Sequence, residues 1–167
     1  MPKVESKVIV PLDLPTAFAL SQTSGEIRKL WDPFIKEQYW LDGAVAPAKG
    51  VKTFTKSRHG FKMISQYVSI KPPKLVGMKM VEGPWFFKSF GGGWIFKDVD
   101  GSTEAIWRYT FTVKPKFLRI VANPIGVRLL RKDIDKRISF YRDACENKEV
   151  ISAAKKLAEL LSEANRH

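Results

Sequence analysis

The chain has 167 residues, 44% of them hydrophobic. This length suffices for one domain with a substantial core, and we do not expect a second domain. Its 29 Lys and Arg outnumber its 17 Asp and Glu, and the net charge of +12 favours anionic partners such as nucleic acid, an acidic membrane or an acidic protein. The single cysteine, Cys145, excludes an internal disulfide and suits a reducing compartment. Because the sequence has no apolar run of membrane-spanning length and no signal-peptide pattern, we expect a cytoplasmic protein.

The first elements are one strand and two short helices. Residues 3–10 alternate with the period of two that is typical of a strand, and residues 14–21 have the composition of a short helix. Thr23 and Glu26 have the spacing of a capping box, which predicts a second short helix ending at Pro33.

The middle of the chain is a series of short strands separated by turns. The predicted strands are 35–41, 51–58, 62–71, 75–82, 85–98 and 103–114. Pairs of turn-forming residues such as Asp100-Gly101 lie between them, so we expect an antiparallel meander. The three glycines at 91–93 would weaken a flat strand, and they predict a bulge or a strong bend in a curled sheet.

The alternation of side chains predicts which faces of two strands look inward. One face of strand 75–82 carries Val76, Met78, Met80 and Glu82, and one face of strand 103–114 carries Ala105, Trp107, Tyr109, Phe111 and Val113. The opposite face of the last strand is mostly polar, which is typical of a sheet exposed to water on one side.

The last third of the chain has helical periodicity. An apolar stripe at steps of three and four residues predicts a long helix over 127–145, formed by Val127, Leu130, Ile134, Ile138, Tyr141 and Cys145. Asn123-Pro124 is expected to separate or kink the preceding segment 117–122. A second helical pattern covers 148–163 after a weak break near Asn147.

The order of these elements resembles the START-related (SRPBCC) superfamily, in its polyketide cyclase/dehydrase-like or coenzyme-Q-binding branch. The motifs that carry the resemblance are Asp-Leu-Pro-Thr-Ala-Phe (13–18), Trp-Asp-Pro (31–33), Ile-Lys-Pro-Pro (70–73), Gly-Trp-Ile-Phe (93–96) and Thr-Glu-Ala-Ile-Trp-Arg-Tyr-Thr-Phe (103–111). The resemblance implies an α+β helix-grip fold, in which a curved antiparallel sheet of about seven strands wraps around a long C-terminal helix, with two short helices after the first strand. We predict this domain over residues 1–147, with 148–167 as a helical extension of the same domain.

The resemblance also implies a cavity between sheet and helix that suits lipids, polyketides, quinones or other apolar molecules. Aromatic side chains on the inner faces could line this cavity or simply fill a core, and flexible methionines suit an adaptable wall. The predicted ligand-binding residues are Phe54, Arg58, Met78, Met80, Glu82, Lys88, Phe90, Trp94, Trp107, Tyr109, Ile134 and Ile138.

Arg58, Glu82 and Lys88 are the candidates for orienting oxygen atoms of a ligand, since an inward-facing charge needs a partner. The alternative is that each lies at a strand end and reaches solvent. The facing of strand 51–58 also stays open, because Val51 and Thr53 could point inward in place of Phe54 and Arg58.

The sequence contains no signature of catalytic, metal-binding or cofactor-binding residues, and we predict none of them. His59 adjoins Gly60 in a predicted turn, a poor position for a buried base. The leading hypothesis is therefore binding or carriage of a hydrophobic small molecule or lipid. A polyketide cyclase or dehydratase is the alternative, because cyclases of this fold can work largely by shaping a reactive chain.

A third hypothesis is an interaction module that uses a basic helix. Segment 116–142 holds eight Lys and Arg against two Asp, and Arg128, Arg131 and Lys132 could bind an anionic membrane or an acidic protein surface. The inward-facing aromatics argue against nucleic-acid binding. No sequence feature indicates an oligomeric state.

Overall fold

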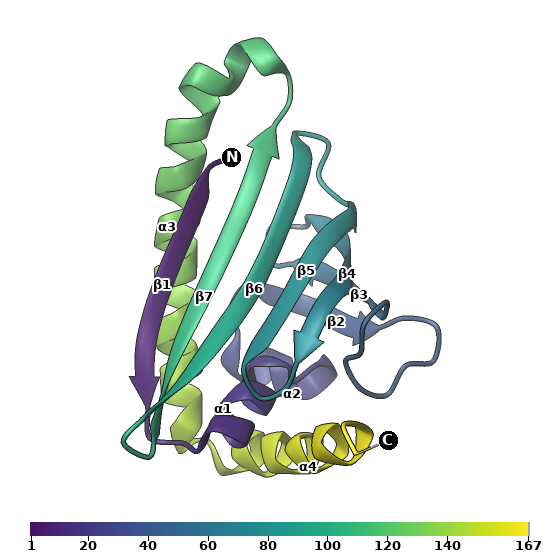
Figure 1. Ribbon diagram of the computed structural model, residues 1–167. Coiled ribbons are helices and arrows are strands. Elements are labelled where there is room, and N and C mark those ends of the chain that lie inside the picture. The colour runs from purple at the N-terminus through teal and green to yellow at the C-terminus, as the bar shows by residue number, and fades with distance from the viewer. Residues whose placement is uncertain (167) are drawn as a thin grey trace.

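The computed structural model describes residues 1–166, and its strands form one seven-stranded antiparallel sheet (Figure 1). The strands are β1 (Lys3–Val10), β2 (Ile35–Trp40), β3 (Lys52–Ser57), β4 (Lys62–Lys71), β5 (Leu75–Glu82), β6 (Phe87–Val99) and β7 (Ser102–Val113). Their order in the sheet is β1-β7-β6-β5-β4-β3-β2, so the meander runs from β2 to β7 and β1 joins the far edge. The predicted α+β helix-grip fold is confirmed.

Two short helices connect the edge strands β1 and β2. These are α1 (Leu14–Ser21) and α2 (Gly25–Trp31), and Figure 1 shows them crossing below the sheet. The predicted capping box at the start of α2 is wrong. The Thr23 hydroxyl donates to the Leu20 carbonyl at 2.8 Å and accepts from Trp31 Nε1 at 2.9 Å. The N-cap residue of α2 is Ser24 and not Thr23.

The long helix α3 (Arg119–Asp143) lies along the inner face of the sheet, against β1 and β7. The predicted stripe faces the core, with Ile134, Ile138 and Tyr141 fully or almost fully buried. The helix begins earlier than predicted, because a short 3-10 turn at Lys116–Leu118 leads into it and it continues through Pro124. Figure 1 shows its first turns rising above the upper ends of the strands.

The last helix, α4 (Lys148–Ala164), forms the base of the molecule. A 3-10 turn at Ala144–Glu146 separates it from α3, and the Asn147 side chain caps it by accepting from the backbone N–H groups of Glu149 and Val150. Its apolar face, with Val150 and Ala154 wholly buried, packs against α1 and α2.

The glycines of β6 do not form the predicted bulge. Gly91, Gly92 and Gly93 pair in continuous register with β5 and β7, and the register shift of β6 lies between Phe87 and Ser89. Of the three glycines, Gly93 is the most closely packed, because an added Cβ at this position would lie 2.5 Å from the Val76 carbonyl oxygen.

Candidate ligand-binding cavity

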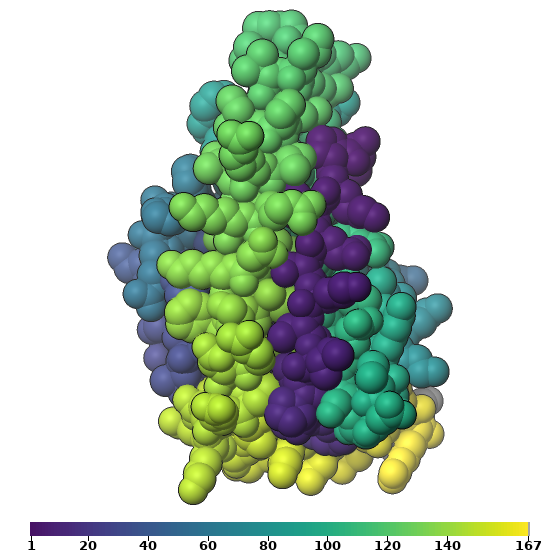
Figure 2. All heavy atoms as spheres, turned by 90° about the vertical axis from the view of Figure 1, so that its left-hand side faces the viewer, coloured from purple at the N-terminus to yellow at the C-terminus, as the bar shows by residue number. Residues whose placement is uncertain are grey.

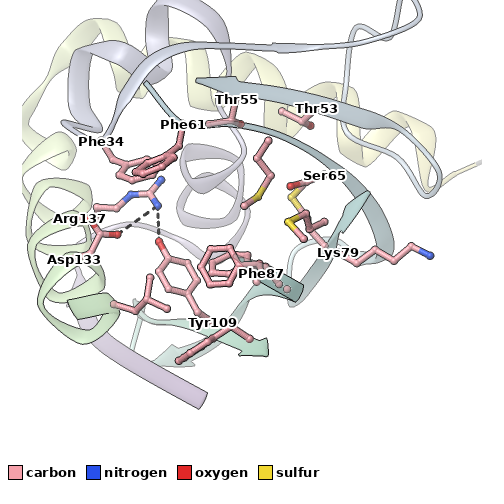
Figure 3. A pocket seen from close by; sticks show the side chains of 18 of the residues that line it. Phe34, Thr53, Thr55, Phe61, Ser65, Lys79, Phe87, Tyr109, Asp133 and Arg137 are labelled. Carbon is pink, nitrogen blue, oxygen red and sulfur yellow. Dashed lines mark hydrogen bonds and ion pairs between the residues drawn. The ribbon is translucent and has the colours of Figure 1, made fainter. Parts of the chain in front are cut away.

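A cavity of about 760 Å³ lies between α3 and the inner face of the sheet, with α2 at one end. Figure 3 shows side chains from the strands and from α3 converging on it. Most of its lining is apolar, and its size is within the range of pockets that hold small molecules. The helix and the sheet therefore leave space between them and do not merge into one filled core.

Aromatic side chains form a continuous wall along this cavity. Ring centroids lie 4.7 Å apart for Phe86 and Phe87, 5.0 Å for Phe87 and Phe90, and 5.3 Å for Phe90 and Tyr109. The wall continues to Trp107, 5.8 Å from Tyr109. Flat apolar ligands pack well against such surfaces.

The exposure of the lining residues shows where the cavity opens. At the end formed by α1 and α2, Gln22 and Arg28 are 5% and 6% exposed. At the opposite end, beside the first turns of α3, Phe61, Ile125 and Leu129 are 51%, 55% and 63% exposed. The mouth is therefore at the upper end in Figure 1, and the α2 end is closed.

A buried cluster of three charged residues lies at the closed side of the cavity. Asp32, wholly buried at the end of α2, accepts hydrogen bonds from Arg28 Nε at 2.9 Å and from Arg137 Nε and Nη2 at 3.1 and 2.7 Å. Both arginines line the cavity and are more than nine-tenths buried. Two guanidinium groups thus share one carboxylate, and the cluster has excess positive charge.

Aromatic rings hold the Arg137 guanidinium in place. It lies 4.4 Å from the ring centroid of Phe34 and 4.4 Å from that of Trp107, and its Nη1 donates a hydrogen bond to the Tyr109 hydroxyl. Figure 3 shows this bond together with the contact to Asp133. Such cation–π contacts are stronger in a desolvated site than at the surface.

The pKa values follow from this arrangement. Burial by itself would raise the pKa of the Asp32 carboxyl, but Arg137 and Arg28 outweigh burial and lower it. Burial lowers the pKa of Arg28, whereas Arg137 has a raised pKa because Asp32 and Tyr109 outweigh its burial. The cluster therefore stays charged at neutral pH, with Asp32 ionised between two cations.

A second carboxyl near the cluster, that of Asp133, lines the cavity one helical turn before Arg137. Its Oδ2 lies 4.0 Å from Arg137 Nη1, and burial raises its pKa although Arg137 acts in the opposite direction. A carboxyl with a raised pKa in a cleft can exchange protons closer to neutral pH than an ordinary one.

A neutral polar group completes the closed end. The Tyr67 hydroxyl donates to Gln22 Oε1 at 2.9 Å, and Gln22 Nε2 donates to Ser21 Oγ at 2.8 Å. Burial raises the pKa of Tyr67, so the hydroxyl keeps its proton. A hydrogen-bonded chain of polar side chains thus lies at the closed end.

Half of the predicted ligand-binding residues line this cavity. They are Met78, Met80, Phe90, Trp94, Trp107 and Tyr109. The inward facing of Met78, Met80, Trp107 and Tyr109 agrees with the side-chain alternation predicted for their two strands. The role of all six residues in binding stays a prediction.

Phe54 and Arg58 lie outside the cavity, so placing them in it was wrong. The inner face of β3 carries Thr53 and Thr55, while Phe54 stacks on Tyr39 with ring centroids 5.0 Å apart. Arg58 is exposed beyond the end of β3. The sequence allowed either Phe54 and Arg58 or Val51 and Thr53 to point inward, and in the structure Thr53 points inward.

Glu82 and Lys88 are exposed and do not reach the cavity either. The alternation of β5 is interrupted by a register shift that separates Met80 from Glu82. A second shift at Phe87 turns both Phe87 and Phe90 inward and leaves Lys88 in solvent.

Ile134 and Ile138 are buried but not part of the cavity wall. They lie on the same turns of α3 as Asp133 and Arg137, but they pack into the hydrophobic core, where α3 contacts β1 and β7. They therefore stabilise the core beside the cavity.

Arg28 and Arg137 were missed as cavity residues, and so was Asp32, the buried carboxylate that binds both of them. A weak signal was present, because Arg28 and Asp32 have the i,i+4 spacing of a helical ion pair. Arg137 also interrupts the apolar stripe of α3 between Ile134 and Ile138, where a charge is unusual.

Two further observations concern residues 1–166. Within this part of the chain, His, Cys, Asp and Glu side chains nowhere gather in threes in a way that could hold a metal ion. None of its helices combines the length and apolar character that crossing a membrane requires.

Comparisons with solved structures show a shared fold at low sequence identity. A START superfamily protein from Mycobacterium smegmatis matches with a TM-score of 0.72 and 14% identity, over 88% of this chain and 99% of that one. Protein XoxI from Bacillus cereus matches with a TM-score of 0.69 and 12% identity, over 89% and 99%. The di-domain ARO/CYC StfQ from the steffimycin biosynthetic pathway matches with a TM-score of 0.67 and 16% identity, over 88% of this chain and 51% of its own.

The sequence itself gives a family assignment. No curated protein matches the chain significantly. Residues 1–145 match the family described as polyketide cyclase / dehydrase and lipid transport. The chain therefore belongs to this family.

Proposed function

We propose that the protein binds and carries a hydrophobic small molecule or lipid in the cavity between sheet and α3. The observation that carries the proposal is the cavity itself, about 760 Å³ in volume, with an aromatic wall and a mouth at one end. An occupant would remove this apolar surface from water, which is the main source of affinity for such ligands.

The charged cluster supports an amphipathic ligand. Arg28 lines the cavity and uses Nε and Nη1 for Asp32 and the Ser21 carbonyl, while its Nη2 makes no hydrogen bond within residues 1–166. A guanidinium donates up to five hydrogen bonds and prefers oxygen anions. A carboxylate or polarised carbonyl of the ligand would fit here, with its apolar body toward the mouth.

The test is native mass spectrometry of the purified protein with lipid extraction, followed by thermal-shift assays with a fatty acid, a quinone and an aromatic polyketide. We expect a bound molecule or a ligand-dependent rise in melting temperature. Met78→Trp fills the cavity and should abolish the shift, whereas Val68→Trp adds the same ring at an exposed position outside the cavity lining and should not. An empty protein with no shift for any ligand would overturn the proposal.

The polar end has its own test. A long-chain fatty acid should bind more tightly than the corresponding alcohol, and Arg28→Gln should remove most of that difference. If Arg28→Gln kept the wild-type preference for the fatty acid over the alcohol, Arg28 would not be the residue that binds the polar end of the ligand.

A cyclase-like activity is the second candidate, favoured by the position of Asp133. Asp133, Arg137 and Tyr109 line the same part of the cavity, and the Asp133 carboxyl has a raised pKa. Asp133 could accept a proton from a carbon between two carbonyl groups, while the Arg137 guanidinium stabilises the enolate oxygen.

Turnover of a linear poly-β-ketone thioester tests this activity. Asp133→Asn should abolish turnover and leave binding of the substrate unchanged. Glu82→Ala, at an exposed carboxyl outside the cavity, is the matched control and should be fully active. Unchanged turnover in Asp133→Asn excludes Asp133 as the base.

A further inference from the structure

Large apolar side chains are exposed around the mouth of the cavity. Trp85, in the turn between β5 and β6, is 80% exposed, and Phe117 and Ile120, at the start of α3, are 79% and 86% exposed. We call this surface the tip and define it as Trp85, Phe117, Ile120, Val121, Ile125 and Leu129. Figure 2 shows the first turns of α3 standing above the rest of the molecule.

The helical part of the tip is a regular stripe. Val121, Ile125 and Leu129 follow each other at steps of four residues, so they lie on one side of α3, and all three are more than half exposed. Monomeric proteins seldom expose apolar side chains in such a contiguous set without a binding role.

The segments that carry the tip are rich in cations and poor in carboxylates. Segment 114–132 contains six Lys and Arg and no Asp or Glu, and the turn that carries Trp85 is followed by Lys88. Lys114 and Lys116 lie next to Phe117 and are exposed. The carboxylate nearest to Trp85 in sequence is Glu82, at the end of β5.

We propose that the tip docks on the surface of a membrane that contains anionic lipids. An apolar centre that enters the acyl boundary, surrounded by cations at headgroup level, is the arrangement that binds such surfaces. Tryptophan favours this interface because its ring is both apolar and polar. Arg128, Arg131 and Lys132, predicted from sequence to meet an anionic partner, are exposed and follow the tip along α3.

The charge distribution argues against a second copy of the chain as the occupant. Two tips face to face would bring two cationic rims together, with no carboxylate in segment 114–132 of either copy to compensate. A lipid surface supplies both an apolar interior for the side chains of the tip and a layer of negative charge for the cations beside it.

Docking at the tip would place the mouth of the cavity against the membrane. Ile125 and Leu129 belong both to the tip and to the cavity lining. Trp85 contacts Phe86 at 5.9 Å between ring centroids, and Phe86 begins the aromatic wall. An apolar molecule could therefore move between bilayer and cavity without crossing water. The docking itself does not depend on the identity of the cavity's ligand.

Vesicle flotation of the full chain tests the docking. We expect binding to vesicles of equimolar phosphatidylcholine and phosphatidylserine, and little binding to phosphatidylcholine alone. Phe117→Ser combined with Ile120→Ser leaves the charge unchanged and should weaken binding at least about tenfold. Leu160→Ser is the matched control, since Leu160 is 50% exposed on α4 at the other end of the molecule.

Two further measurements distinguish a membrane from a second copy of the chain as the partner of the tip. Trp85 is far more exposed than Trp31, Trp94 and Trp107, each at 4%, so a blue shift of fluorescence on vesicle addition should disappear in Trp85→Phe. Lys114→Glu with Lys116→Glu should weaken binding and reduce its dependence on salt. The proposal is overturned by equal binding to both vesicles, by binding that ignores the Phe117 and Ile120 changes, or by a dimer that these changes dissociate.

Discussion

Asp32 and Arg137 are joined by two hydrogen bonds of 3.1 and 2.7 Å, although they lie 105 positions apart in the chain. The contact links the end of α2 to the C-terminal third of α3, and it fixes a buried guanidinium on the cavity wall. Because Asp32 also holds Arg28, one carboxylate organises the closed side of the cavity.

Asp32→Asn should lower the free energy of unfolding by about 3 to 5 kcal/mol, because it removes the carboxylate that both buried guanidinium groups share and leaves Arg137 with only the more distant Asp133, at 4.0 Å. Urea unfolding measures the loss. Asp143→Asn removes a carboxylate from an exposed pair with Arg142 and should cost less than about 1 kcal/mol. A loss in Asp32→Asn no larger than in this control would show that the cluster is not charged in the folded protein.

The stability that Asp32 contributes should depend on pH. Its pKa is lower in the folded protein than in the unfolded chain, so the unfolded state binds more protons and stability rises with pH in that window. The contribution is present at neutral pH and is lost as the pH falls below about 4 and through the folded pKa.

Urea midpoints of wild type and Asp32→Asn at a series of pH values check this. The gap between the two proteins should be widest near pH 7 and narrow in acid. A gap of constant width would mean that Asp32 acts through packing alone.

Trp107→Ala should destabilise the protein by about 3 to 5 kcal/mol. Trp107 is 4% exposed, stacks on Trp94 with ring centroids 4.2 Å apart, and lies under the Arg137 guanidinium. Trp85→Ala removes the same ring from an 80% exposed position and should change the stability by less than about 0.5 kcal/mol. Thermal or urea unfolding compares the two variants, and equal losses would contradict the assigned facing of β7.

Neighbouring glycines of β6 should respond differently to alanine. At Gly93 the new methyl group would lie 2.5 Å from the Val76 carbonyl oxygen, and the strand must move at a cost of about 1 to 3 kcal/mol. At Gly92 its nearest neighbour is the Tyr109 ring at 3.5 Å, an ordinary contact. Gly92→Ala should therefore be the more stable variant in urea unfolding, and the reverse order would refute the close approach of β5 and β6 at Gly93.

The fold was readable from the sequence because its signals are local. Turn pairs such as Asp100-Gly101, where both residues have positive φ, fix the hairpin between β6 and β7. The stripe from Ile134 to Tyr141 fixes the buried face of α3. Neither signal requires knowledge of distant partners.

Only half of the predicted lining residues were placed correctly from the sequence, because the direction in which a strand side chain points depends on how that strand pairs with its neighbours. A single register shift reverses the direction of every later side chain, so Glu82 and Lys88 could not be placed by alternation alone. The cluster around Asp32 was missed for another reason. Its three charges come from α2, from the residue that follows it and from α3, and only the folded chain shows that they contact one another.

The base formed by α1, α2 and α4 lies at the closed end of the cavity, opposite the mouth. If the protein carries a ligand as proposed, loading and unloading would both use the rim of the mouth. The order of entry would then set the order of release, because the last part of the ligand to enter would be the first to leave.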